Sequence, residues 1–196
     1  MDSPQRGMSA PPNNPVEIIR MLDSHMDHEV SLVLYGRASL ALGFAEPRAE
    51  SLSTKDVDAI ISFSQLEEIE NDFRFWDAVE ATNEALSPRG LYITHLFGEE
   101  QVFLRPEWEL HIVPVLRPPT RWLRLFRPHT IDLILTKMMR GNDQQDMEDI
   151  RFLIQHDGIS AAQLEPAFAT VRMPDVIELH EAFGRALPAV RAMLPN

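Results

Sequence analysis

The sequence predicts a mixed-sheet α/β core with flanking helices and a C-terminal helical block. Up to about residue 90, short apolar runs of strand length alternate with segments of helical periodicity. Several strand-like runs then follow one another, and from Pro128 onward only helical patterns remain. We therefore expect a disordered tail over residues 1–14, an α/β core over residues 15–127 and a helical block over residues 128–196 packed on that core.

Length and composition fit one globular domain. A chain of 196 residues with 44% hydrophobic and 24% charged residues can bury a sizeable core. The absence of Cys excludes a disulfide scaffold, thiol catalysis and Cys-ligated metal. No apolar run approaches the roughly 18–20 residues of a membrane span, so we expect a cytoplasmic protein with no membrane contact. The net charge of −12 argues against nucleic-acid binding over the whole surface.

A helix and two buried strands are expected first. The helix begins near Pro15, because proline is tolerated in a first helical turn. Residues 31–35 and 56–61 are apolar runs of strand length, and residues 38–42 form a short helix between them that Gly43 ends.

A longer helix follows the second strand. Ser64 and Glu67 form a capping box, and the helical pattern continues to about Leu86. Apolar residues at helical spacing form the stripe expected to face the core: Leu66, Ile69, Phe73, Trp76 and Val79.

Further strands and then helices complete the chain. The remaining strand-like runs are residues 91–97, 101–104 and 108–115. The helices are expected between residues 128 and 141, between 143 and 157, from 160, and from about 174 to 194. The arginine-rich segment 117–127 is expected to be a solvated, proline-broken connection, with contact to RNA or nucleotide phosphates as the alternative.

Asp56-Val57-Asp58 is the first candidate for chemistry. On a strand, residues i and i+2 point to the same face, with roughly 6.6–6.8 Å between their α-carbons. Two ionised carboxylates at that distance repel each other by about 3 kcal/mol at an effective dielectric of about 20. A fold does not need this repulsion, whereas Mg²⁺ binds one or two carboxylates together with substrate phosphates. The other interpretation is a solvated strand edge.

The turn after the first strand is a second candidate. Gly36 lets the backbone approach a phosphate closely, and the backbone N–H groups of a strand–helix turn bind anions. Arg37 adds a positive charge and Ser39 a hydroxyl. A tight turn without a ligand is the alternative, since such turns are common in α/β proteins.

Together these segments resemble the nucleotidyltransferase superfamily typified by DNA polymerase β. Its signature is an apolar strand, a glycine followed by a small residue, and an Asp-x-Asp pair. Gly36 matches the glycine, Asp56 and Asp58 match the pair, and Thr54 lies two residues before it, while Arg37 departs from the usual Gly or Ser. Four segments also resemble an uncharacterised bacterial family near the AbiEii type IV toxin nucleotidyltransferases: residues 36–43, 54–60, 90–97 and 132–140.

The resemblance implies a nucleotidyltransferase-type fold and a metal-dependent reaction. Asp56 and Asp58 would bind Mg²⁺ or Mn²⁺, and an acceptor hydroxyl would attack the α-phosphorus of an NTP while pyrophosphate leaves. The resemblance does not identify the acceptor, which is a protein, an RNA or a small molecule. Analogy with AbiEii relatives adds a role as toxin or defence effector with an antitoxin partner. The residues expected to bind the nucleotide are Gly36, Arg37, Ser39, Thr54 and Lys137.

Lys137 belongs to the helical block and is one of only two lysines among 18 basic residues. It is expected at the flank of its helix's apolar stripe, from which a lysine can extend toward a triphosphate. AbiEii-like proteins carry such a lysine followed by an Asp-bearing segment, which Asp146 and Asp149 match. These two acids would orient Lys137, bind metal through water, or form a solvated acidic face.

The superfamily also has a third carboxylate on a neighbouring strand. Glu109 is the candidate, on the strand expected over residues 108–115, and Glu99 and Glu100 compete but look like turn residues. Without a third carboxylate facing the pair, the alternative is a catalytically inactive nucleotide-binding or protein-interaction module with the same fold.

Overall fold

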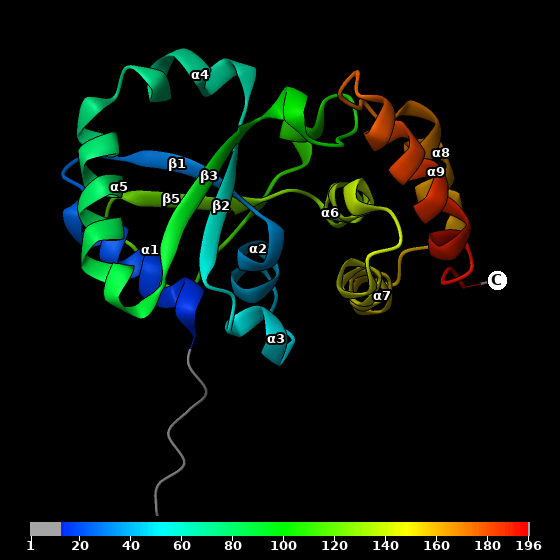
Figure 1. Cartoon of the computed structure of the whole chain (residues 1–196), viewed down its shortest axis with the longest axis horizontal. Helices are drawn as coiled ribbons and strands as arrows, with labels where there is room; N and C mark the ends of the chain where they lie inside the picture. Colours follow the sequence, from blue (N-terminus) through cyan, green and yellow to red (C-terminus); the bar gives the residue numbers. More distant parts are fainter. Residues whose placement is uncertain (1–12, 196) are drawn as a thin grey trace, which may run out of the picture.

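The computed structural model describes residues 13–195, which contain a five-stranded mixed sheet (Figure 1). The strands are β1 (Val30–Tyr35), β2 (Asp56–Ile61), β3 (Tyr92–Gly98), β4 (Val113–Pro114) and β5 (Leu123–Arg127). Their order in the sheet is β3-β2-β1-β5-β4. The β1–β2 and β4–β5 pairs are antiparallel, whereas β2–β3 and β1–β5 are parallel. The predicted mixed α/β class is therefore confirmed.

Helices flank the sheet and make up the C-terminal block. The α-helices are α1 (Asn14–His25), α2 (Gly36–Gly43), α3 (Ala49–Leu52), α4 (Phe63–Glu70), α5 (Phe73–Leu86), α6 (Thr130–Lys137), α7 (Gln144–Asp157), α8 (Ala161–Thr170) and α9 (Ile177–Arg191). The 3₁₀ helices are η1 (Ser87–Arg89), η2 (Glu99–Gln101), η3 (Trp108–His111) and η4 (Met138–Arg140). Most of the tail expected over residues 1–14 lies outside the described residues, and Asn14 already begins α1.

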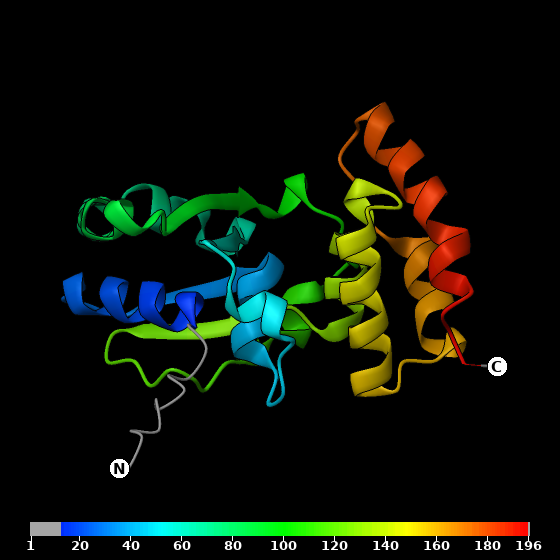
Figure 2. The ribbon, with the colours of Figure 1, turned by 60° about the horizontal axis from the view of Figure 1, so that its bottom comes forward.

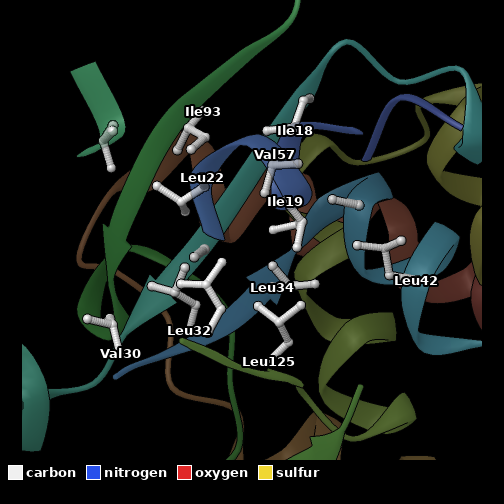
Figure 3. Packing of buried hydrophobic residues seen from close by; sticks show 14 of the residues in the cluster. Ile18, Ile19, Leu22, Val30, Leu32, Leu34, Leu42, Val57, Ile93 and Leu125 are labelled. Atoms are coloured by element: carbon white, nitrogen blue, oxygen red, sulfur yellow. The ribbon is translucent and has the colours of Figure 1, made fainter. Parts of the chain in front are cut away.

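One face of the sheet is covered by α1 and α5, and the main core lies there (Figures 1 and 3). Ile18 and Leu22 of α1 pack there with Leu34 of β1 and Val57 of β2 (Figure 3). Full burial of such a side chain stabilises the fold by roughly 1.5–3 kcal/mol. Because side chains alternate along β2, burying Val57 on this face directs its acidic neighbours to the opposite face.

The helical block has an apolar core of its own, at one end of the sheet next to α2 (Figure 2). Leu135 of α6, Ile150 of α7 and Ala186 of α9 are fully buried in it. Leu40 of α2 belongs to the same cluster and so joins the block to the α/β core. Among the described residues, no helix combines the length and apolar character that crossing a bilayer requires.

The helix expected over residues 64–86 is two helices, α4 and α5. The break lies at Asp72, whose side chain accepts a hydrogen bond from Phe75 N and so caps α5. The break changes the helical phase, because Phe75 is fully buried while Phe73 is 74% and Trp76 38% exposed. The expectation that Phe73 and Trp76 face the core was therefore wrong.

The strands beyond β3 also differ from the prediction. Residues 101–104 contribute only an isolated bridge between Leu104 and Arg172, and the strand expected over residues 108–115 is η3 followed by the two-residue β4. The segment expected to be a solvated connection contains β5, which pairs with β1. Asp23 anchors its start, because its carboxylate accepts hydrogen bonds from three consecutive backbone N–H groups, Arg121 to Leu123.

Candidate active site

A cavity of about 400 Å³ lies on the sheet face opposite α1 and α5, where the sheet meets the helical block. Its walls come from the β1–α2 turn, the start of β2, and the segment from α6 to α7. The predicted site residues that line it are Gly36, Arg37, Thr54, Asp56, Asp58, Lys137 and Asp146. The predicted site residues outside its lining are Ser39, Glu109 and Asp149.

The β1–α2 turn depends on glycine for conformation and for space. Gly36 has a φ of +61°, a region that L side chains rarely adopt, and a Cβ there would lie 3.8 Å from Asp58 Oδ2. Tyr35 precedes α2 without a side-chain cap, so the first N–H groups of the helix lack a capping acceptor. Ser39 is fully buried and its hydroxyl donates to Gly36 O at 2.7 Å, so this residue supports the turn instead of lining the cavity.

Asp56 and Asp58 face the cavity together, as their spacing predicted. Each carboxylate is held by a threonine: Thr54 Oγ1 donates to Asp56 Oδ1 at 2.5 Å, and Thr94 Oγ1 donates to Asp58 Oδ1 at 2.5 Å. The His95 backbone N–H also donates to Asp58 Oδ1, at 3.2 Å. Among the described residues, the Oδ2 atoms of both aspartates accept no hydrogen bond, so these atoms are available to a ligand.

A bulge in the β2–β3 pairing supplies the donors that hold Asp58. The register shifts between Val57 and Ala59, so that Asp58 lies opposite both Thr94 and His95. Bulges re-aim side chains and are frequent beside functional sites. The His95 ring stacks on Phe97 with centroids 5.2 Å apart and stays 67% exposed beside the pair.

Burial and the repulsion between the two carboxylates make the charged form of Asp58 less favourable. Burial raises the pKa of Asp58, and the neighbouring charge of Asp56 raises it further, against the opposing hydrogen bond from Thr94. Burial, together with the charges of Asp146 and Asp58, also raises the pKa of Tyr35 to about 12, so its hydroxyl stays protonated at neutral pH.

The donor set of the pair fits a hard divalent cation that completes its coordination with phosphates and water. Both free oxygens are carboxylate oxygens, and the missing side chain at Gly36 keeps Asp58 Oδ2 open. Over residues 13–195 no cluster of three or more His, Asp or Glu side chains could hold a metal ion by itself. A cation here would therefore depend on ligands from the substrate.

Lys137 lies in a buried ion-pair cluster, not at an exposed flank. It is 8% exposed, and its Nζ donates to Asp149 Oδ2 at 2.8 Å and to Asp146 Oδ1 at 3.1 Å. Arg140 Nε donates to the other oxygen of Asp146 at 2.6 Å. Of the interpretations of the two acids, their orientation of Lys137 agrees with this geometry, and a solvated acidic face does not, because both acids are buried.

Arg37 approaches the same cluster from the β1–α2 turn. Its Nε lies 3.7 Å from Asp149 Oδ2, and within residues 13–195 this buried nitrogen has no hydrogen-bond acceptor. The side-chain oxygen of Gln145, with the amide suitably oriented, accepts from both terminal nitrogens of Arg37. Arg48 NH1 donates to Asp149 Oδ1 at 3.3 Å and completes the surroundings of that carboxylate.

Glu109 does not lie where the prediction placed it. It belongs to η3 instead of a strand, accepts a hydrogen bond from Ser64 Oγ at 3.3 Å, and lines a separate cavity that also includes Ser31 and Trp108. The buried Trp108 anchors η3, a tertiary contact that a period-two pattern does not reveal. On β3, the strand next to the pair, Thr94 and His95 occupy the positions opposite Asp58.

Residues of the site that received no role from the sequence include Thr94, Arg140 and Gln145. Arg140 had a detectable signal, because a residue three positions after Lys137 lies on the same side of a helix. Thr94 had none, since its contact with Asp58 depends on the bulge.

A family model described as "Nucleotidyltransferase of unknown function (DUF6036)" matches residues 16–172. The chain belongs to this family. Membership confirms the nucleotidyltransferase superfamily that Gly36 and the acidic pair had indicated, while the closer likeness to AbiEii-type toxins stays a prediction. No curated protein and no solved structure matches the chain.

Proposed function

We propose that this DUF6036 protein is a metal-dependent nucleotidyltransferase that moves NMP from an NTP to a hydroxyl group of an acceptor. One observation carries the proposal: two carboxylates with free Oδ2 atoms face a glycine turn at the start of a helix, with Asp58 Oδ2 3.8 Å from the place of a Gly36 Cβ. The uncapped N–H groups of α2 suit an anion, and the free oxygens suit a cation bound between them and the phosphates.

Asp56 and Asp58 would hold Mg²⁺ or Mn²⁺, each through its free oxygen, while Thr54 and Thr94 fix the other oxygen. Gly36 and Arg37 would lie against the phosphates. A bound cation neutralises phosphate charge and lowers the pKa of an acceptor hydroxyl.

The residues of the cavity then orient an in-line displacement. The acceptor oxygen forms a bond to the α-phosphorus as the bond from that phosphorus to the β-phosphate oxygen breaks. Pyrophosphate leaves with the electron pair, and the hydroxyl proton passes to solvent. Holding the reacting atoms in line is the main contribution of the protein in phosphoryl-type transfers.

The test follows an NTP label in the α-phosphate. Wild-type protein with Mg²⁺ or Mn²⁺ should move the label onto a component of a protein, RNA or small-molecule pool and release pyrophosphate. Asp56→Asn and Asp58→Asn should both abolish transfer, because each removes a cation ligand. Absence of nucleotide binding in the wild type would contradict the proposal outright.

The second candidate is a nucleotide-binding or protein-interaction module without transfer activity. Within residues 13–195, no third carboxylate gathers with Asp56 and Asp58, and this observation favours it. The same experiment separates the two candidates, because tight metal-dependent NTP binding without label transfer to any pool supports the module.

The resemblance to AbiEii-type toxins extends the proposal to a cytoplasmic defence effector with an antitoxin partner. This extension rests on analogy alone. Growth arrest on expression, abolished by Asp58→Asn, would support it, and unimpaired growth with active enzyme would contradict it.

A further inference from the structure

Cationic side chains from both sides surround the candidate cavity, but they differ in how free they are. Arg37 comes from the β1–α2 turn, and Lys137 and Arg140 come from the helical block. Lys137 is 8% exposed with two carboxylates on its ammonium, whereas the Arg140 side chain is 57% exposed. Withdrawing Lys137 toward a ligand would remove a cationic partner from two buried carboxylates at once, leaving Asp146 with Arg140 and Asp149 with Arg48, which is a large cost.

Arg140 is held in place and still has donors to spare. Its Nε donates to Asp146 Oδ2 at 2.6 Å and its NH2 to Asp143 Oδ1 at 3.2 Å. Among the described residues, no acceptor contacts its NH1 group. A guanidinium fixed on one edge and open on another can bind a phosphate with little loss of conformational entropy.

Arg37 is incompletely satisfied on the opposite wall. In the part of the chain that the structure describes, its buried Nε has no acceptor, although its terminal nitrogens share the oxygen of Gln145 when that amide is suitably oriented. Buried donors in native proteins are rarely left without a partner. An anion in the cavity would offer this side chain acceptors that its present surroundings lack.

The two arginines are connected through Lys137. Asp146 accepts from Lys137 with one oxygen and from Arg140 with the other. Asp149 accepts from Lys137 at 2.8 Å and lies 3.7 Å from Arg37 Nε. Lys137 thus fixes the two carboxylates beside which the arginines stand.

We infer that Arg140 and Arg37 bind the β- and γ-phosphates of the NTP from opposite walls, and that Lys137 is a positioning residue acting through Asp146 and Asp149. The inference rests on the proposed function and changes the role expected for Lys137. The expected ligand is a polyphosphate with at least two phosphate groups, and its binding does not depend on the nucleotide base.

Titration calorimetry with inorganic tripolyphosphate and Mg²⁺ tests the phosphate assignment without knowledge of the base. The four NTPs and their NDP and NMP forms are titrated in the same way. Arg140→Met should weaken triphosphate and tripolyphosphate binding about 10- to 100-fold, the usual range for a charge-assisted hydrogen bond. NDP should lose less, and NMP affinity should stay within about twofold. Arg140→Lys should recover only part of the loss, because an ammonium cannot bind Asp146 and a phosphate in the same fork geometry.

Arg191→Met is the matched control. Like Arg140, Arg191 donates two hydrogen bonds to carboxylate oxygens, in its case both on Glu165, but it lies on α9 and outside the cavity lining. Its replacement should leave every affinity unchanged.

The positioning role is tested by non-additivity. Asp146→Asn should weaken NTP binding several-fold in the wild type and cause no further loss in Arg140→Met. The effects of substitutions are not additive when one residue acts through contact with the other. A full second loss would overturn the positioning role, and unchanged binding in both Arg140→Met and Arg140→Lys would overturn the phosphate assignment. If the wild type binds no nucleotide and no tripolyphosphate, the proposed function fails and the inference fails with it.

Discussion

The two walls of the cavity carry similar numbers of charged groups but balance them in opposite ways. On the sheet side, Asp56 and Asp58 stand together with hydroxyl and N–H donors, and no cationic side chain of the described residues contacts their free oxygens. On the helical side, each buried acid contacts Lys137, and arginines complete the pairing. The acidic pair on the sheet side is therefore not ion-paired through its free oxygens, whereas each buried acid on the helical side has cationic partners, Lys137 and Arg140 for Asp146 and Lys137 and Arg48 for Asp149.

This difference indicates which wall binds the ligand and which wall stabilises the fold. Uncompensated repulsion destabilises a fold, so it persists where a ligand relieves it. A buried, paired cluster contributes mainly through what breaking it would cost. We therefore expect substitutions on the helical side to affect stability most, and substitutions on the sheet side to affect ligand binding most.

The largest effect is expected for Lys137→Met, which leaves Asp146 and Asp149 buried without their shared cation. The free energy of unfolding should fall by about 3–5 kcal/mol, measured by urea denaturation. Lys55→Met is the control, because Lys55 is exposed and should change stability by less than about 0.5 kcal/mol. A neutral or stabilising Lys137→Met would show that the cluster is solvated, and the contrast between the walls would disappear.

Gly36→Ala should cost about 1–2 kcal/mol of stability, because alanine is strained at a φ of +61°. Gly158→Ala is a matched control, since Gly158 has a φ of +63° and no atom within 4 Å of an added Cβ. Both changes should lower stability similarly. Only Gly36→Ala should weaken Mg²⁺–NTP binding, because its methyl group enters the space beside Asp58. Equal binding by the two variants would remove the turn from the site.

Asp58→Asn should behave in the opposite way to Lys137→Met. The amide keeps an oxygen for Thr94 and His95 N–H but removes the charge that repels Asp56, so the apo protein should gain about 1 kcal/mol. Metal-dependent NTP stabilisation should vanish in the same variant, as read by the melting temperature with and without Mg²⁺–NTP. Clear destabilisation of the apo fold would identify the pair as structural.

The smallest effect is expected at His28, a third charge cluster that is partly exposed and lies away from the cavity. Hydrogen bonds from both ring nitrogens, to Asp72 at 2.6 Å and to Asp27 at 2.7 Å, raise the pKa of His28. Because the folded pKa is raised, the stabilisation is fully present below the unfolded value of about 6.5 and is lost as the pH rises through the folded pKa.

Unfolding of wild type and His28→Gln from about pH 5 to about pH 9 measures this contribution. We expect the wild type to be more stable than His28→Gln at the acidic end, by no more than about 1 kcal/mol because solvent screens the ion pairs of His28. This difference in stability should fade as the pH rises. A difference that grows toward alkaline pH would contradict the assignment.

The sequence predicted the parts of the site that depend on local pattern. Period-two alternation put Asp56 and Asp58 on one face, and Gly36 was recognisable from its place between a buried strand and a helix. Lys137 was assigned to the flank of its helix, because helical spacing does not reveal that α7 covers it with two acids.

The remaining errors share a physical origin in tertiary contact. The third-carboxylate prediction failed because η3 is fixed by burial of Trp108, and Thr94 contacts Asp58 only because of a bulge. Strand β5 was missed because its two arginines, the exposed Arg124 and the buried Arg127, obscured the alternating burial of Leu123 and Leu125, and it pairs with a strand about 90 residues earlier in the chain.

Asp56 and Asp58 are expected to bind a divalent cation together with a triphosphate at the Gly36 turn. A crystal structure with Mn²⁺ and a non-hydrolysable NTP analogue, with anomalous scattering to locate the metal, tests this binding mode. We predict a peak about 2.0–2.2 Å from oxygens of both aspartates, with the triphosphate between the turn and Arg140. Nucleotide bound elsewhere, or manganese at Asp143 and Asp146 with none at the pair, would contradict the account.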